Sequence, residues 1–194
     1  MQELLYFCFA LYTQIQAAST YEAVPDKDEP ASLKLPWFVK VTWVLQGVVF
    51  AAATVVGLMY WVLVYPDTKE KKAELGEPNW EPNIISMIKH GGNTLAIYID
   101  MAVAVQPFLL MHAIYAAMYS IAFMSWSYIH YALEIGNEDG DPYIYKVLDW
   151  SRPEVAGKIS FMVGLMGIPI ICGLGFCFFG GNGMRGRKTP DAAV

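Results

Sequence analysis

Long apolar runs separated by short polar segments dominate the pattern of this chain. A run of about 20 apolar residues is long enough to cross the hydrocarbon core of a bilayer as a helix. The pattern therefore predicts an all-α fold, an integral membrane helical bundle of about five transmembrane helices, in a single transmembrane domain that covers residues 1–194. The predicted spans are residues 4–18, 37–65, 84–105, 108–132 and 155–179.

The span over residues 37–65 is the clearest of the five. Trp37 and Trp43 stand near one end of it, and Tyr60 and Trp61 stand near the other. Aromatic residues concentrate at the two membrane–water interfaces. This arrangement indicates a helix that reaches both interfaces.

The first apolar run, residues 4–18, differs from a signal peptide. Glu3 precedes it without any Lys or Arg, and Gln14 and Gln16 interrupt it. A secretory signal has a basic region before its apolar core and a small-residue cleavage site after it. We therefore predict a short or truncated transmembrane helix here.

The two middle runs, 84–105 and 108–132, meet at Gln106 and Pro107. Because proline suits the first turn of a helix, Pro107 is expected to start the second of them. We predict a helical hairpin at the centre of the bundle. The charged segments 67–82 and 134–153 are predicted loops, and the segment PYIYKVLDW in the second is expected to fold back on the bundle, where Asp149 would cap or pair.

Composition supports the membrane class. Hydrophobic residues make up 56% of the chain and charged residues only 16%, against about 25% charged residues in ordinary soluble domains. The net charge of −5 excludes nucleic acid as a partner, because nucleic-acid-binding surfaces are basic. Lys and Arg are divided equally between the two predicted sides, so the orientation is not defined. An organelle inner membrane is one of the membranes considered.

Polar residues inside predicted spans are the candidate functional residues. Burying a polar group in a membrane is costly, so such residues mark functional sites by default. Two faces of the predicted hairpin carry them at helical spacing. This intramembrane polar cluster consists of His90, Asn93, Thr94, Asp100, His112, Tyr115 and Tyr119.

Two interpretations of Asp100 and His112 remain open. A symmetric hairpin would put them at one depth, where an Asp–His pair acts as an acid–base dyad or a proton relay. Alternatively, the two neutralise each other and lock the hairpin. His90 and His112 would lie about 15 Å apart in depth at the helical rise per residue, so we predict no metal site and no cofactor. Thr94 and Ser120 are nucleophile candidates by position only.

Several segments in a fixed order resemble the rolling stone-like family of multispanning membrane proteins. That family shows an H-G-x-N segment followed by an Asp, then a P-x-x-x-x-H segment, then a Y-P-x-L-D-W loop. The resemblance covers roughly residues 37–180, with Lys146 where the family usually has Pro. The family usually has further spans before this point, which implies an absent early span or a processed or incomplete chain. The matching residues are His90, Gly91, Asn93, Asp100, Pro107, His112, Tyr145, Leu148, Asp149 and Trp150.

The family is distantly similar to the androgen-induced and androgen-dependent membrane hydrolases. Those threonine hydrolases act on fatty acid esters of hydroxy fatty acids, with a catalytic Thr on an early span and a catalytic His in an H-G-x-H-T segment. Aligned on IKHGGNT, the catalytic His falls on Asn93, and His90 matches a non-catalytic His. The Thr would lie near Leu4, where this chain has none. The similarity thus implies that both halves of the dyad are missing.

The residues and the resemblance together predict a non-catalytic multispanning membrane protein of the rolling stone type. It would serve a structural role or pack as an accessory subunit in a larger membrane complex. Its predicted partners are membrane lipids and other membrane protein subunits. The alternative is a membrane-embedded lipid-ester hydrolase with a rearranged site around His112 and Asp100.

Overall fold

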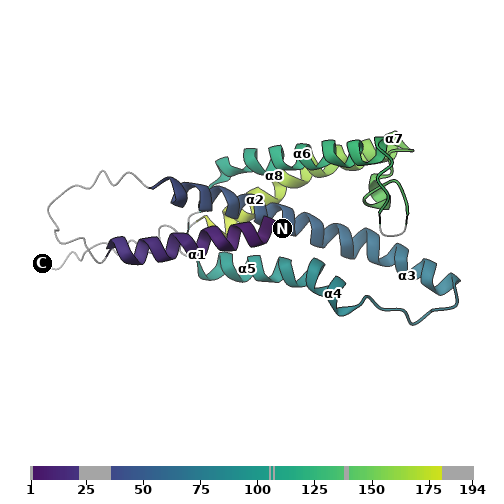
Figure 1. Ribbon diagram of the computed structural model, residues 1–194, viewed down its shortest axis with the longest axis horizontal. Helices are drawn as coiled ribbons and strands as arrows, with labels where there is room; N and C mark the ends of the chain where they lie inside the picture. The colour runs from purple at the N-terminus through teal and green to yellow at the C-terminus, as the bar shows by residue number, and fades with distance from the viewer. Residues whose placement is uncertain (1, 22–35, 105, 107, 138–139, 181–194) are drawn as a thin grey trace, which may run out of the picture.

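The structure, a computed structural model, is helical throughout its regular parts and describes residues 2–21, 36–104, 106, 108–137 and 140–180. The consecutive helical segments within these residues join into five rods, whose arrangement is shown in Figure 1. The rods contain α1 (Gln2–Tyr21); α2 (Trp37–Met59), η1 (Tyr60–Val64) and α3 (Tyr65–Glu74); α4 (Ile84–Met87), η2 (Ile88–Gly92) and α5 (Asn93–Val103); η3 (Leu110–His112) and α6 (Ala113–Ala132); and α7 (Pro153–Phe161), η5 (Met162–Gly167) and α8 (Ile168–Phe179). A short helical turn, η4 (Lys146–Leu148), lies in the last long loop. The segments η1, η2 and η5 are π-helical, whereas η3 and η4 are 3₁₀ turns.

The second rod is longer than predicted, because residues 67–74 are helical and not part of a loop. Glu, Lys and Ala, which dominate this stretch, are strong helix formers. Asp67 in the first turn and Lys71 in the last complement the helix dipole. The rod ends where Gly76 takes a φ of +87°, and the amide of Glu77 bonds back to the carbonyl of Lys72 at 2.8 Å, as in a glycine-terminated helix.

The helix at the centre of the bundle is α2, not the predicted hairpin. It packs against α1, α5, α6 and α8, whereas α5 and α6 do not pack closely on each other. Figure 1 shows α5 and α6 on different sides of α2. The chain leaves α5 in an extended conformation at Ala104 (ψ 137°) and starts the next helix only at Leu110, two residues later than predicted. The two helices of the predicted hairpin therefore lie on different sides of α2 and do not form a hairpin.

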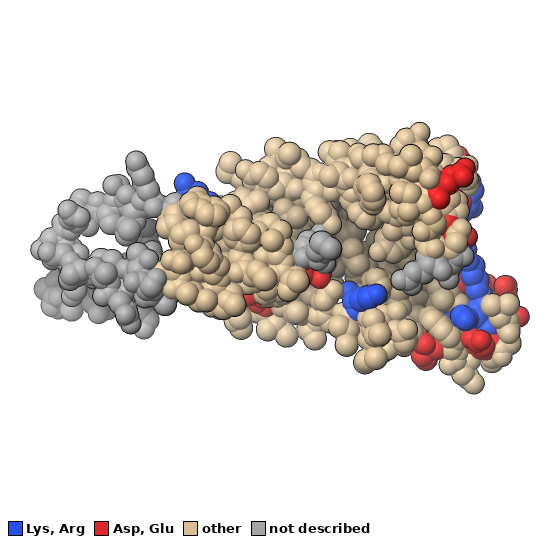
Figure 2. Space-filling view, viewed as in Figure 1, with Lys and Arg blue, Asp and Glu red and all other residues tan. Residues whose placement is uncertain are grey.

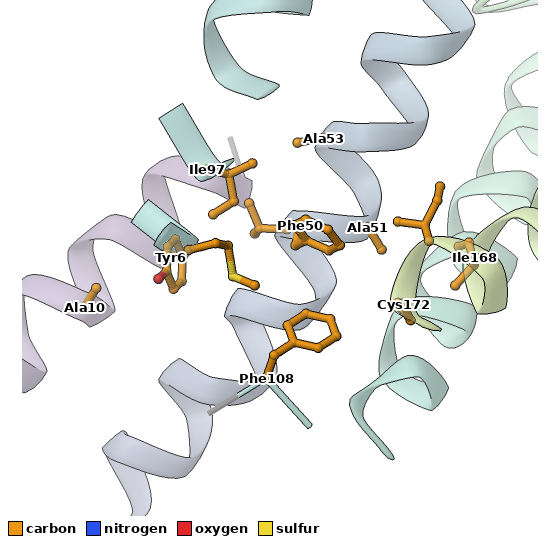
Figure 3. Packing of buried hydrophobic residues seen from close by; sticks show 13 residues of the cluster. Tyr6, Ala10, Phe50, Ala51, Ala53, Ile97, Phe108, Ile168 and Cys172 are labelled. Carbon is orange, nitrogen blue, oxygen red and sulfur yellow. The ribbon is translucent and has the colours of Figure 1, made fainter. Parts of the chain in front are cut away.

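Small residues on α2 let its neighbours approach. Ala51 and Ala53 are almost fully buried, and Phe50 projects between them into the hydrophobic core. Figure 3 shows Phe50 close to Ile97 of α5 and Phe108, with Cys172 and Ile168 of α8 further along the same core. Close helix contacts at small residues are typical of membrane bundles.

Two of the rods are long and apolar enough to cross a membrane by length and composition: Trp37–Glu74 and Pro153–Phe179. The predicted spans 37–65 and 155–179 fall within them. Figure 2 shows that charged side chains gather at the end of the molecule near α3 and α7, while most of the remaining visible face is uncharged. That distribution suits helices whose sides face a bilayer.

Candidate functional site

A cavity of about 430 Å³ lies between the rods, bounded by α2, η2, α6, η5 and the loop that contains η4. We call it the His90 cavity. Its size falls within the range of about 300–1,000 Å³ typical of ligand sites. Most of its lining is apolar, and the polar side chains in it are Glu3, Tyr60, Lys89, His90, Asn93, Tyr119, Ser120 and Tyr145.

All three π-helical segments of the described chain contribute to this cavity. Tyr60 comes from η1, Lys89 and His90 come from η2, and Val163 comes from η5. A π-helical turn accommodates one extra residue in a helix, is rare, and occurs frequently at functional sites. The coincidence of three such segments at one cavity makes it the candidate functional site.

Tyr60 and His90 hold each other in a fixed orientation. Their rings stack with centroids 3.9 Å apart and an angle of 8° between the planes. The two helices approach closely here, since a Cβ on Gly57 would lie 3.1 Å from the carbonyl oxygen of His90 and 2.6 Å from Oγ1 of Thr94. Only glycine fits at position 57 without displacing the neighbouring helix.

The imidazole of His90 has a hydrogen-bonding atom that the protein leaves unsatisfied. Its Nδ1 is buried and has no hydrogen-bond partner within the described residues. Buried polar atoms nearly always have a partner, so an exception calls for an explanation such as a bound group.

Of the predicted polar cluster, the structure brings His90, Asn93 and Tyr119 together around the cavity. Asn93 donates from Nδ2 to the carbonyl oxygen of Lys89 at 3.0 Å. Thr94 turns away to the second rod and donates from its hydroxyl to the carbonyl oxygen of Ala53 at 2.9 Å. This last bond ties α5 to α2.

Asp100 and His112 do not form the predicted pair. The hydroxyl of Tyr6 donates to Oδ2 of Asp100 at 2.5 Å, which joins α1 to α5. Nδ1 of His112 lies 3.1 Å from the carbonyl oxygen of Trp43 and donates to it, because a carbonyl can only accept. The pairing fails because α5 and α6 lie on different sides of α2 instead of side by side.

Position 47 explains how His112 reaches α2. A Cβ on Gly47 would lie 3.1 Å from Cβ of His112, so the glycine leaves room for it. Tyr115, one turn further along α6, packs edge-on against the imidazole of His112 with ring centroids 6.0 Å apart. His112 of η3 thus serves the contact with α2, and Tyr115 packs on its ring.

Sequence reasoning missed Tyr6, Gln46 and Tyr60. Tyr6 and Gln46 are almost fully buried, at 0% and 1% exposure. Gln46 could have been predicted from the sequence. Its amide lies in the middle of an apolar span, where burying it is as costly as burying the side chains of the predicted polar cluster. The aromatic pattern predicts Tyr60 at the membrane interface, but its side chain is buried against His90. Nothing in its spacing distinguishes the two roles.

The loop after α6 folds back on the bundle, as predicted. Leu148 is buried, and the indole nitrogen of Trp150 donates to the hydroxyl of Ser127 at 3.0 Å. Asp149 accepts a bond from the amide of Ser151 at 3.0 Å and lies 3.4 Å from the guanidinium of Arg152. Hydrogen bonds from Ser151, and then the charge of Arg152, hold the pKa of the Asp149 carboxyl below its usual value.

Lys146, where the family pattern has Pro, joins this loop to the second rod. Its Nζ lies 2.8 Å and 3.0 Å from the two carboxylate oxygens of Asp67. The hydrogen bond to Asp67 raises the pKa of the Lys146 ammonium. The contact brings the segments around positions 67 and 146 to the same end of the bundle.

No group of three His, Cys, Asp or Glu side chains within the described ranges could hold a metal ion. The three cysteines are free thiols; Cys172 is buried, whereas Cys8 and Cys177 are exposed.

Two rods long and apolar enough to cross a membrane and a largely uncharged visible face (Figure 2) are features of helical membrane proteins. The family model described as protein rolling stone matches residues 14–185, so the chain belongs to the rolling stone family. Protein rolling stone of Drosophila melanogaster is 28% identical over 114 residues, which are 59% of this chain and 38% of the relative. The match thus covers less than half of that protein's length. No solved structure matches the chain.

Proposed function

We propose that the chain is a non-catalytic, multispanning membrane protein of the rolling stone type, in which the five helical rods are the five spans. The interior polar side chains of this bundle hold helices together and do not react. Lipids surround its apolar faces. The bonding of the candidate catalytic side chains carries this proposal.

Three of the candidate side chains, Asp100, His112 and Thr94, are each bonded to another helix. Asp100 accepts from Tyr6, His112 bonds the carbonyl of Trp43, and Thr94 donates to the carbonyl of Ala53. Nucleophilic catalysis requires a hydroxyl or thiol within about 3 Å of a base. Here the hydroxyl and the two bases are used for helix–helix bonds, which favours a structural role for them.

Hydrolysis is the test that separates this proposal from the hydrolase alternative. The protein is purified into phosphatidylcholine nanodiscs and incubated with a fatty acid ester of a hydroxy fatty acid, and the released fatty acid is measured. We expect no release above that of empty nanodiscs. Release that disappears in His112→Gln or Asp100→Asn, with folding unchanged, would overturn the non-catalytic proposal in favour of a rearranged site.

An accessory-subunit role is the second proposal, and it rests on the face formed by α7, η5 and α8. Phe161, Leu165 and Met166 are exposed there. A Cβ on Gly157 or Gly173 would have no heavy atom within 4 Å, so a further helix has room to approach closely at these positions.

Gentle solubilisation of the native membrane followed by a native gel tests this second role. Stoichiometric migration with a larger assembly would support it, and Gly173→Phe should then release the protein from that assembly. Migration near its own mass of 21.7 kDa plus bound detergent would contradict a subunit role.

A further inference from the structure

We propose that the His90 cavity is a binding site for an anionic amphiphile, a molecule with a carboxylate or phosphate headgroup and an apolar chain. The headgroup would lie at Lys89 and His90, and the chain would lie along α2, α6 and η5. This inference goes beyond the proposed function, since it holds whether or not the protein is a subunit. It rests on the chemistry of the cavity walls.

The walls of the cavity differ in polarity. Lys89, His90 and Asn93 form the wall contributed by η2 and the start of α5. The other walls are mostly apolar and include Val56 of α2, Phe123 of α6 and Val163 of η5, with Tyr119 and Ser120 as polar exceptions on α6. A ligand with one polar and one apolar end matches this division, because each end then meets groups of its own kind.

The polar wall favours a negatively charged group. Lys89 is exposed and has no carboxylate within ion-pair distance in the described part of the chain. Glu3, the acidic side chain of the lining, forms no ion pair with it within the described residues. Nδ1 of the His90 imidazole beside Lys89 is buried and has no protein partner. An ammonium and an imidazole N–H together donate to one anion by charge-assisted hydrogen bonds, the strong class of such bonds.

The polar wall is also held in place before any ligand binds. Stacking on Tyr60 fixes the plane of the His90 ring, and the close approach at Gly57 fixes the distance between the two helices that carry them. A site whose groups are already oriented loses less free energy when it orders a ligand. The π-helical segments η1 and η2 place Tyr60 and His90 at the cavity.

Photo-crosslinking of the full chain in phosphatidylcholine nanodiscs tests the proposal. The probe is oleate with a diazirine on its chain, and the labelled peptides are located by mass spectrometry. We expect label on the peptides that contain Val56, Phe123 or Val163. Unlabelled oleate or 1-oleoyl-lysophosphatidate should compete, and oleyl alcohol should not. Which of the two anions competes better identifies a free acid or a phospholipid as the ligand.

Three single variants locate the headgroup. Lys89→Gln removes the charge, and His90→Phe removes the ring nitrogens but keeps an aromatic ring to stack on Tyr60. Each variant should raise the concentration of unlabelled oleate needed for half-maximal competition about tenfold or more. That is the effect expected from losing one charge-assisted hydrogen bond. Lys40→Gln is the matched control, because Lys40 is also exposed but does not line the cavity; it should compete like wild type.

The chain-binding wall is tested separately with Val163→Phe, which fills the cavity and leaves Lys89 and His90 intact. If thermal unfolding is unchanged and the label is lost, the site is confirmed. Equal competition by oleyl alcohol, label spread over the lipid-facing helix surfaces, or unchanged binding in both Lys89→Gln and His90→Phe would overturn the proposal. These outcomes are independent of the hydrolysis assay, so failure here leaves the proposed function standing.

Discussion

At the level of single residues, a carboxylate inside an apolar bundle must find a partner, because a buried charge without one is very costly. Asp100 obtains its partner from α1 through the hydroxyl of Tyr6. Tyr6 is itself fully buried. The two residues therefore depend on each other, and the bond joins segments 94 residues apart in the chain.

Substitutions at Asp100 should separate loss of charge from loss of the bond. Asp100→Asn keeps an oxygen that can accept from Tyr6, whereas Asp100→Ala leaves that hydroxyl buried without its acceptor. An unsatisfied buried donor costs about 1–3 kcal/mol, so Asp100→Ala should unfold at a distinctly lower temperature than Asp100→Asn. Thermal unfolding in nanodiscs measures this difference. Adding Tyr6→Phe to Asp100→Ala should recover part of the loss, and equal losses for Asn and Ala would contradict the assignment.

Asp149 should make the stability depend on pH in the acidic range. Because its folded-state pKa is lowered by Ser151 and Arg152, its contribution is fully present above the unfolded value, about 3.9, and is lost as the pH falls through the lowered folded value. Wild type should therefore exceed Asp149→Asn in unfolding temperature at pH 7, and the gap should close below about pH 4. A gap that persists unchanged at the lowest pH would show that the charge is not the cause.

At the level of helices, the packing of α8 on α2 depends on one glycine. A Cβ on Gly175 would lie 2.7 Å from a ring carbon of Phe50 and 3.0 Å from one of Phe108. Both rings are in the hydrophobic core, at 2% and 3% exposure. They have little room to move, since protein interiors are densely packed.

Gly175→Ala should therefore destabilise the bundle by about 1–3 kcal/mol, the usual cost of overpacking a core. Gly173→Ala, two residues earlier on the same helix, is the matched control, because its Cβ would meet nothing within 4 Å. Alanine is the better helix former, so that variant should be neutral or slightly stabilised. Unfolding temperatures of the two variants in the same nanodiscs check the contrast, which equal values would contradict.

Much of the helix content could be predicted from the sequence, since apolar runs of helical length set the positions of the rods. The end of the second rod differs from the prediction, because the charges between 67 and 74 indicate a loop whereas Glu, Lys and Ala favour helix. The π-helical segments gave no signal, because one inserted residue changes neither composition nor hydrophobicity. Because these segments are not predictable from the sequence, the stacking of Tyr60 on His90 is not predictable either.

At the level of the whole molecule, the arrangement of the rods was harder to predict than the rods themselves. Hydrophobic pattern shows that a helix is apolar, but in a membrane bundle it does not show which side faces its neighbours. The central position of α2 depends on small residues such as Ala51 and Gly57 and on single contacts such as His112 with Trp43. Of the predicted polar cluster, His90, Asn93 and Tyr119 line one cavity, whereas Asp100 and His112 bond to Tyr6 and Trp43 instead of to each other.

The five-span proposal makes a prediction about the two sides of the membrane. The ion pair between Lys146 and Asp67 puts positions 67 and 146 at one end of the bundle. In the five-span arrangement an odd number of crossings separates both from position 36, which directly precedes the second rod. In a cysteine-free background, Glu74→Cys and Ser151→Cys should react with a membrane-impermeant maleimide from the same side. Pro36→Cys should react from the opposite side. If Glu74→Cys and Ser151→Cys react in intact vesicles, Pro36→Cys should react only after permeabilisation. If the orientation is opposite, Pro36→Cys should react in intact vesicles and the other two only after permeabilisation.

Sealed membrane vesicles of one orientation provide the measurement, and the protein with Cys8, Cys172 and Cys177 replaced provides the blank. The result depends on the apolar length of the second rod, because 23 residues of α2 at about 1.5 Å each exceed the roughly 30 Å hydrocarbon core. Reaction of all three positions from one side would show that this rod does not cross the bilayer. The five-span arrangement would then be wrong, even though the helices and the His90 cavity would remain as they are.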